Sequence, residues 1–262
     1  MMRTEHTATP RALNDQQLRC FRTNGFVVVR QQVPTAFLVG VQVLLERLVD
    51  ERIAWWQSES CFSRHHAAGF ADLGFTTRYF HAWVAAGRPT RTPPDYEGLF
   101  SSEAFTPHAE QRWLTRLAAD ALGVEHAVPL QNLIARAKFP ADEHSSLPWH
   151  QDAPCVDPVA GADFVTAWIP LVDIPARNPS LEVSPMNRRT IFEPEWSERH
   201  RYLFMQPSDV DRLEVRRPIS MRRGDLLLFG PHVPHRSMPN QGLTTRWSVD
   251  FRFTPAVGTP WS

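Results

Sequence analysis

Hydrophobic positions in the first half of the chain recur mostly at helical spacing. Asn14 and Gln17 have the pattern of a capping box, and Gly25 supplies a stop, so we predict a short helix between them. The β-branched and aromatic run 26–30 predicts a strand. Thr35 is expected to cap a longer helix. Its apolar stripe, which we assign to the core, contains Phe37, Val41, Leu44, Leu45 and Leu48.

The stretch 57–108 shows no such period and is rich in Pro, Gly and aromatic residues. An irregular stretch of that length in a compact domain is usually functional, so we predict a lid there. Residues 110–122, closed by Gly123, predict a further helix. Aromatic residues and arginines in the lid suit an anionic, sugar-like or amino-acid-derived small molecule, although they also suit plain packing and solvation. The candidate substrate contacts are Arg64, Arg78, Trp83 and, outside the lid, Gln151.

From residue 128 onward the pattern changes to short alternating runs separated by Pro, Gly and Asp. The clearest runs cover residues 130–139, 164–174, 226–229 and 245–253. Such spacing predicts a sandwich or barrel instead of a βαβ sheet. We therefore expect a mainly β fold with flanking α, a jelly roll with N-terminal helices packed on one sheet. One domain spans 1–262, with helices and lid in 1–127 and the jelly-roll core in 128–256.

Composition narrows the class of partner. Lys+Arg and Asp+Glu are both 28 in 262 residues, which gives no charge excess for nucleic acid or an anionic membrane. The N-terminal residues lack a signal-type apolar run, and no stretch approaches the length of a spanning helix. We expect a cytoplasmic protein with a small-molecule substrate and leave its oligomeric state open. Three cysteines without paired spacing predict neither a disulfide framework nor a zinc knuckle.

Lysine is almost absent from the chain. Lys138 is the single lysine, and the remaining basic residues are arginines. Arginine codons are GC-rich and lysine codons are not, so this usage indicates a GC-rich genome. A bacterial biosynthetic enzyme is the context that we prefer.

The main candidate for chemistry is His150-Gln151-Asp152. In an extended segment, residues i and i+2 project from the same side, and Pro148 favours an extended approach, so His150 and Asp152 can converge on one ion. Two imidazoles and one carboxylate leave free positions on Fe(II), as oxygen activation requires. The third ligand is His232 or His235, which both follow the strand 226–229. Spacing alone does not choose between these two histidines.

The residues that follow favour His235. It precedes Ser237 by two residues and Arg246 by eleven, and an arginine fork suits the far carboxylate of a dicarboxylate cosubstrate. On the last predicted strand, Arg246, Ser248, Asp250 and Arg252 alternate with apolar residues. A solvated outer face is the simplest interpretation of that alternation and fits Arg252 well. For Arg246, the spacing to His235 favours a role in the site.

These motifs together resemble the phytanoyl-CoA dioxygenase superfamily, which uses non-haem Fe(II) and 2-oxoglutarate. The resemblance rests on the segments 13–29, 147–152, 167–173 and 235–246 and leaves out roughly 55–110 and 186–215. It implies a double-stranded β-helix with iron on His150, Asp152 and His235. It further implies that Arg246, with Ser237 beside it, binds the far carboxylate of 2-oxoglutarate. Cosubstrate positions of the family are matched by Trp168, Asn132 and Arg136, the last two in some members only.

The resemblance also implies the chemistry, in which molecular oxygen and 2-oxoglutarate are consumed and a substrate C–H bond is oxidised. Halogenases of this family carry a small residue in place of the carboxylate ligand, so Asp152 favours hydroxylation. Desaturation, cyclisation and epoxidation need the same ligands and stay open. Two alternatives remain, namely a cupin-type metal enzyme that does not use 2-oxoglutarate and a binding module that has lost catalysis. Around Asn178-Pro179 the chain lacks the glycine usual in the family.

Overall fold

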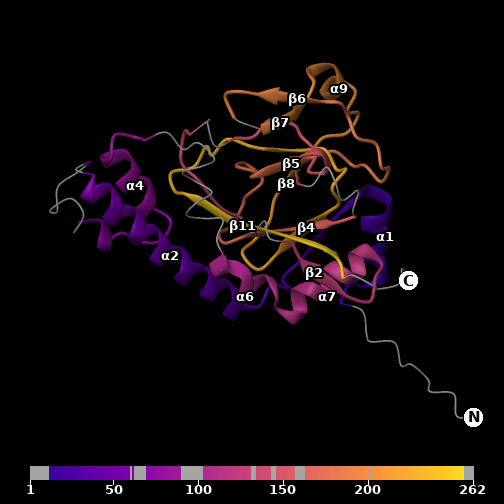
Figure 1. The fold of residues 1–262 in the computed structure, drawn as a ribbon, viewed down its shortest axis with the longest axis horizontal. Coiled ribbons are helices and arrows are strands. Elements are labelled where there is room, and N and C mark those ends of the chain that lie inside the picture. Colours follow the sequence, from indigo (N-terminus) through magenta and orange to yellow (C-terminus); the bar gives the residue numbers. More distant parts are fainter. Residues whose placement is uncertain are drawn as a thin grey trace, which may run out of the picture.

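A computed structural model describes residues 12–59, 61, 69–89, 103–130, 134–142, 146–156, 163–200 and 202–256 (Figure 1). The larger of its two facing sheets has the order β1-β9-β4-β11-β2, and β3 also pairs with β11. All of these pairings are antiparallel. The strands of this sheet are β1 Phe26–Val29, β2 Ala127–Pro129, β3 Ile134–Lys138, β4 Val165–Pro170, β9 Leu226–Phe229 and β11 Arg246–Pro255.

A smaller sheet faces the inner side of the larger one. Its order is β10-β5-β8, and a separate hairpin, β6–β7, lies beyond it in Figure 1. One buried cluster joins the two sheets, with Trp168 and Phe229 contributed by the larger sheet and Leu181 and Val183 by the smaller. The expected mainly β jelly-roll fold is therefore confirmed, with an open edge instead of a closed barrel. The bounds are β5 Leu181–Val183, β8 Arg217–Ile219, β10 His235–Ser237, β6 Pro194–Ser197 and β7 Tyr202–Met205.

Helices cover the outer side of the larger sheet, as Figure 1 shows for α2, α6 and α7. Phe37 of α2 packs edge-on against Phe251 of β11 with ring centroids 6.0 Å apart, within the main core cluster. The alternation of β11 therefore places its apolar residues under the helices. The helices are α1 Asp15–Asn24, α2 Thr35–Ser58, α4 Arg78–Ala85, η1 Glu103–Phe105, α6 Thr106–Ala109, α7 Arg112–Leu122, α8 Ala153–Val156 and α9 Pro207–Asp211.

The helix signals in the sequence hold with two corrections. The capping box of Asn14 and Gln17 is present, and Gly25 ends α1 in a left-handed conformation with φ 77°. Thr35 is not a cap, because Pro34 precedes the first helical residue and no side chain caps this end. The prediction of an irregular 57–108 stretch was wrong for its described part, which contains α4, η1 and α6. Helical packing against the core replaces the irregular chain there.

The predicted strands lie where the structure has strands, but most of their bounds differ. The run 226–229 matches β9, whereas the runs 164–174 and 245–253 correspond to β4 and the longer β11. The run 130–139 overlaps β3, which starts only at Ile134. The three cysteines are free thiols. Among the described residues, no helix is long and apolar enough to span a membrane.

Candidate metal centre

Backbone pairing brings the two histidines of the site together. The His150 amide donates to the His235 carbonyl, and the His235 amide donates to the His150 carbonyl, both at 2.9 Å. This pairing places the His150–Asp152 segment beside β10, the strand that begins at His235. Two residues that are 85 positions apart in the chain are thus held side by side. The extended backbone expected around His150 is what makes the pairing possible.

Both imidazoles are oriented by backbone carbonyls. His150 Nδ1 lies 2.7 Å from the Pro148 carbonyl oxygen, and His235 Nδ1 lies 3.0 Å from that of Val233. A carbonyl oxygen only accepts, so each Nδ1 carries the proton and donates. Each Nε2 is then left with its lone pair, the form that binds a metal.

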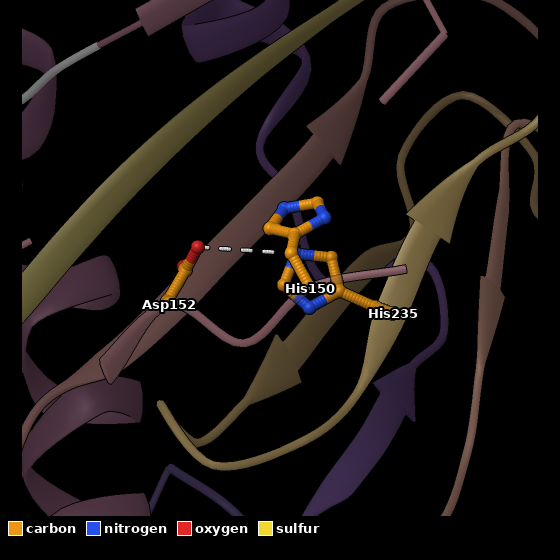
Figure 2. A group of neighbouring side chains, drawn as sticks. All are labelled: His150, Asp152 and His235. Atoms are coloured by element: carbon orange, nitrogen blue, oxygen red, sulfur yellow. Dashed lines mark ion pairs between the residues drawn. The ribbon is translucent and has the colours of Figure 1, made fainter. Parts of the chain in front are cut away.

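His150, Asp152 and His235 form a compact triad, shown in Figure 2. Their potential ligand atoms all lie within 4.8 Å of one another. The residues are 4%, 1% and 6% exposed. His235 Nε2 lies 3.9 Å from Asp152 Oδ1, the contact drawn as a dashed line. Two imidazoles and one carboxylate in this arrangement form a ligand set that leaves part of an iron coordination sphere open.

Asp152 is held through one of its two oxygens. Oδ2 accepts from Thr166 Oγ1 at 3.0 Å and from Nε of Arg252 at 3.2 Å. Arg252 Nη2 also lies 3.2 Å from the same oxygen. Oδ1 is buried and has no hydrogen-bond partner in the described structure. A buried carboxylate oxygen without a partner is costly unless a cation binds it, so Oδ1 suits a single bond to a metal.

The charge states of the triad also suit a metal. Burial lowers the pKa of His150 well below its usual value, and the neighbouring His235 lowers it further. Burial likewise lowers the pKa of His235. Burial alone would raise the pKa of Asp152, but Arg252, His235, His150 and Thr166 together bring it well below its usual range. At neutral pH the site therefore offers two neutral imidazoles and one carboxylate, which are the protonation states that metal binding requires.

A pocket opens beside the triad, and it contains Trp168, Arg136 and Ser237 among the predicted cosubstrate contacts. Arg136 Nε donates to Asp250 Oδ2 at 2.6 Å, so this arginine is paired with a carboxylate inside the pocket. The pocket is lined by Arg136, Lys138, Leu147, His150, Asp152, Trp168, Leu181, Phe229, His235, Ser237, Asp250 and Arg252. Asn132, the remaining predicted cosubstrate contact apart from Arg246, lies outside the described residues.

Arg246 is buried, but protein oxygens surround the ends of its guanidinium. Nη1 lies 3.1 Å and 2.6 Å from the carbonyl oxygens of Asn178 and Pro179, and 2.9 Å from Asn178 Oδ1. Nη2 donates to the carbonyl of Met238. Nε is buried without a partner in the described structure. Burial lowers the pKa of Arg246 to about 10, which leaves it charged at neutral pH. A bidentate fork toward the pocket is therefore not formed in this arrangement.

Of the predicted substrate contacts, the three that the structure describes, Gln151, Arg78 and Trp83, do not line the pocket. Gln151 Nε2 donates to the carbonyls of Thr190 and His232, and Gln151 Oε1 accepts from the Phe192 amide. Its amide thus anchors the 190–192 segment, and the substrate contact of Gln151 stays a prediction. Arg64 lies outside the described residues.

Arg78 and Trp83 both belong to α4 and contact neighbouring elements of the protein, so their substrate contacts also stay predictions. Arg78 donates to Asp50 of α2 at 2.7 Å, and Trp83 packs on Phe139 with ring centroids 4.9 Å apart. The neighbouring Tyr79 stacks on Trp247 of β11. The aromatic residues of this region therefore cover the outer face of the larger sheet, on the side away from the metal ligands.

Arg252 is the main site residue that sequence reasoning misplaced. It was expected on a solvated face, yet it is 2% exposed and pairs with Asp152. Thr166 was also missed, and it lies directly opposite Arg252 in the β4–β11 register. The alternation along 246–252 was the available signal, because a metal ligand on the inner face needs charged neighbours. His232 is not part of the triad, and Gln151 binds its backbone carbonyl.

Three solved structures with the same fold are distant in sequence. SnoN, an epimerase solved with Fe3+, α-ketoglutarate and nogalamycin RO, matches with a TM-score of 0.57 at 16% identity over 94% of this chain and 85% of that one. SnoK, an α-ketoglutarate-dependent carbocyclase from nogalamycin biosynthesis, gives 0.55 at 15% over 94% and 87%. EvdO2 from Micromonospora carbonacea var. aurantiaca, complexed with 2-oxoglutarate, gives 0.56 at 16% over 95% and 93%.

At such identities these likenesses show the fold alone. The sequence itself shows a closer relationship. The phytanoyl-CoA dioxygenase (PhyH) family matches residues 21–248, a span that contains the whole triad and Arg246. The chain belongs to the phytanoyl-CoA dioxygenase (PhyH) family.

Proposed function

We propose that this protein is a non-haem Fe(II)- and 2-oxoglutarate-dependent dioxygenase that hydroxylates an unactivated C–H bond of a small molecule in bacterial secondary metabolism. The observation that carries the proposal is the buried triad, in which His150, Asp152 and His235 each offer a ligand atom within 4.8 Å of the others and Asp152 Oδ1 has no hydrogen-bond partner in the described structure. This donor set fits Fe(II) and leaves positions for a cosubstrate and oxygen. Family membership supports the same assignment.

Each residue of the centre has a definable task. His150, Asp152 and His235 would hold the iron, while Arg252 and Thr166 keep Asp152 Oδ2 occupied and so direct Oδ1 to the metal. Iron and 2-oxoglutarate, when bound, would supply the oxidation of the substrate with molecular oxygen as the oxidant. The apolar side chains of Trp168, Leu181 and Phe229 line the pocket and limit the entry of water.

The type of oxidation is the finer part of the proposal. Asp152 occupies a coordination position that a halogenating enzyme needs for chloride, so we favour hydroxylation. Desaturation, cyclisation and epoxidation use the same ligands. The similar structures include an epimerase and a carbocyclase, and both come from nogalamycin biosynthesis. They support a tailoring role on a natural product. We propose that the protein acts in the cytoplasm.

The second candidate is a metal enzyme on the same fold that does not use 2-oxoglutarate. One observation favours it, namely that the guanidinium ends of Arg246 already contact protein oxygens. Such an enzyme would bind iron at the triad but would have no use for a cation near Ser237. The two candidates therefore differ in whether a dicarboxylate keto acid binds beside the metal.

Anaerobic titration distinguishes them. We expect the Fe(II)-loaded protein to develop a visible metal-to-ligand charge-transfer band as 2-oxoglutarate is added, because a keto acid chelates the open iron positions. The band should be absent when Zn(II) replaces Fe(II), since Zn(II) has no accessible redox state. Iron retention without any band at millimolar 2-oxoglutarate would favour the second candidate.

A further inference from the structure

Strand β7 lies against the segment that carries two of the metal ligands. The Met205 amide donates to the Trp149 carbonyl at 2.8 Å, next to His150. Tyr202 and Phe204 alternate along β7, and both rings approach the His150 ring, with centroids 5.3 Å and 6.1 Å from it. The β6–β7 hairpin therefore adds aromatic side chains to the surroundings of the metal, although neither of them lines the pocket.

Cys155 brings a thiol to the same place. It belongs to α8, which begins directly after Asp152, and its Sγ atom lies 3.9 Å from the Leu203 carbonyl oxygen of β7. The same Sγ atom lies 3.5 Å from the Gln151 carbonyl oxygen, and a side-chain hydrogen bond joins the thiol to the Tyr202 hydroxyl. The thiol and the phenol are thus neighbours, and the charge of Asp152 acts on both groups.

A thiol and a phenol are the most readily oxidised side chains in these surroundings. Thiols lose electrons stepwise to oxidants, and phenols lose a hydrogen atom more easily than the phenyl, alkyl and imidazole groups beside them. The other two cysteines are placed differently, because Cys20 contacts the Phe26 carbonyl and Cys61 is exposed. The pair formed by Cys155 and Tyr202 therefore has a chemistry that the proposed reaction leaves unused.

We propose that Cys155 and Tyr202 form a modification site, in which turnover without substrate joins Cys155 Sγ to a ring carbon beside the Tyr202 hydroxyl as a thioether. The inference rests on the proposed function, because that reaction supplies the oxidant. It goes beyond the proposed function by giving the protein a second oxidation, carried out on its own side chains. The product is a covalent link between α8 and the β6–β7 hairpin, beside the metal ligands.

The reaction balances as a two-electron oxidation of the side-chain pair. A bond forms between Cys155 Sγ and the ring carbon of Tyr202, while the thiol S–H bond and one ring C–H bond break. Molecular oxygen takes up two electrons from 2-oxoglutarate and two from the pair, and succinate, carbon dioxide and water are formed. The oxygen atom that a substrate would receive as hydroxyl leaves as water, with the two hydrogens that the pair loses. A phenol that has lost a hydrogen atom is reactive at the carbons beside its oxygen, which sets the position of the new bond.

Mass spectrometry of tryptic peptides tests the inference. Trypsin releases Cys155 in the peptide 139–177 and Tyr202 in the peptide 202–212. The purified protein is incubated with Fe(II), 2-oxoglutarate and oxygen, without substrate, and is then reduced, alkylated and digested. We expect a linked peptide whose mass is the sum of the two peptides less two hydrogen atoms. The link should survive reduction, because thiols do not cleave a thioether, and fragmentation should place it at Cys155 and Tyr202.

Variants make the result specific. Cys155→Ser and Tyr202→Phe each remove one partner and should form no linked peptide. Cys20→Ser is the matched control, because it removes a thiol that contacts the Phe26 carbonyl instead of β7, and it should form the linked peptide at the wild-type level. Incubation without oxygen should add no linked peptide, and His235→Ala should form none. A thermal melt of each variant checks that it is folded.

The outcomes separate this inference from the proposed function. If the wild-type protein forms succinate but both peptides are recovered only in their unlinked form, the inference is wrong and the proposed function stands. One added oxygen atom on either peptide, without a link, also contradicts the inference. A linked peptide that persists in Cys155→Ser or Tyr202→Phe would show that the pair is misassigned. If the protein forms neither succinate nor the link, the inference is wrong, and the succinate assay with added substrates decides the proposed function separately.

Discussion

Replacing His235 by Ala is expected to abolish iron retention and all conversion of 2-oxoglutarate. The variant loses one of three ligands in a buried site whose remaining members are His150 and Asp152. Loss of residues that merely orient metal ligands already weakens binding or activity by about 10- to 100-fold, so loss of a ligand should exceed 100-fold. Equilibrium dialysis with Fe(II), followed by a colorimetric iron assay, measures the change in affinity.

His232→Ala is the matched control for this substitution. His232 lies in the loop that leads into β10, but its side chain is not part of the triad, and Gln151 contacts its backbone carbonyl. We therefore expect iron affinity within about 2-fold of the wild-type value, the scale of a surface change away from a structural feature. The reverse pattern, with iron lost in His232→Ala and kept in His235→Ala, would show that the ligand assignment is wrong.

Replacing Arg252 by Met is expected to destabilise the metal-free protein by about 3–5 kcal/mol at neutral pH, because it leaves Asp152 buried without its cation. Arg252 and Asp152 are almost fully buried and 3.2 Å apart, so solvent screens this pair weakly. Bound metal should restore part of the loss, since a divalent cation compensates the same carboxylate. Urea denaturation with and without Ni(II) measures both effects.

The loss should depend on pH in a defined direction. The pKa of Asp152 is lowered in the folded protein, so this group stabilises the fold above its unfolded pKa and loses that contribution as pH falls through the folded value. Without Arg252, burial raises the pKa of Asp152. Protonation of Asp152 then removes the buried, unpaired charge of the variant at low pH. The stability difference between wild type and variant is therefore largest near neutral pH and shrinks on acidification.

Arg236→Met provides the control for Arg252→Met. Arg236 also pairs with a carboxylate, Glu182, at 2.6 Å, but the arginine side chain of this pair is 37% exposed. Exposed pairs contribute about 0–1 kcal/mol, so the free energy of unfolding should change little and should not respond to Ni(II). Equal losses in the two variants, or a loss in Arg252→Met that metal leaves unchanged, would contradict the role given to Arg252.

The metal triad was accessible from the sequence because its geometry is local and periodic. His150 and Asp152 share one side of an extended segment, and the distance from His235 to Arg246 selected one histidine of two. Arg252 was misplaced for a physical reason. Alternation shows which residues share a face, but β11 is buried on both faces through residues 246–253. A strand between helices and a polar pocket therefore has the same pattern as a strand facing water.

The protein contacts of the predicted substrate residues could not be inferred from the sequence, for a different reason. Gln151 forms hydrogen bonds with Thr190 and Phe192, about forty residues away. No spacing in the sequence predicts such a partner. Trp83 and Arg78 are residue types that commonly line a binding site. In the structure, Trp83 packs on Phe139 and Arg78 contacts Asp50 of α2. Composition shows what a segment can contact, and only the tertiary arrangement shows what it does contact. The division into 1–127 and 128–256 remains a prediction.

The central claim is that this site couples iron to 2-oxoglutarate, and iron-dependent formation of succinate tests it most directly. Purified protein is supplied with Fe(II), ascorbate, oxygen and 2-oxoglutarate, without further substrate, and succinate is quantified by mass spectrometry. We predict slow succinate formation that chelation of iron abolishes and that His235→Ala lacks. Iron-loaded, folded protein that forms no succinate above the His235→Ala background, both alone and with a panel of small-molecule substrates, would contradict the account.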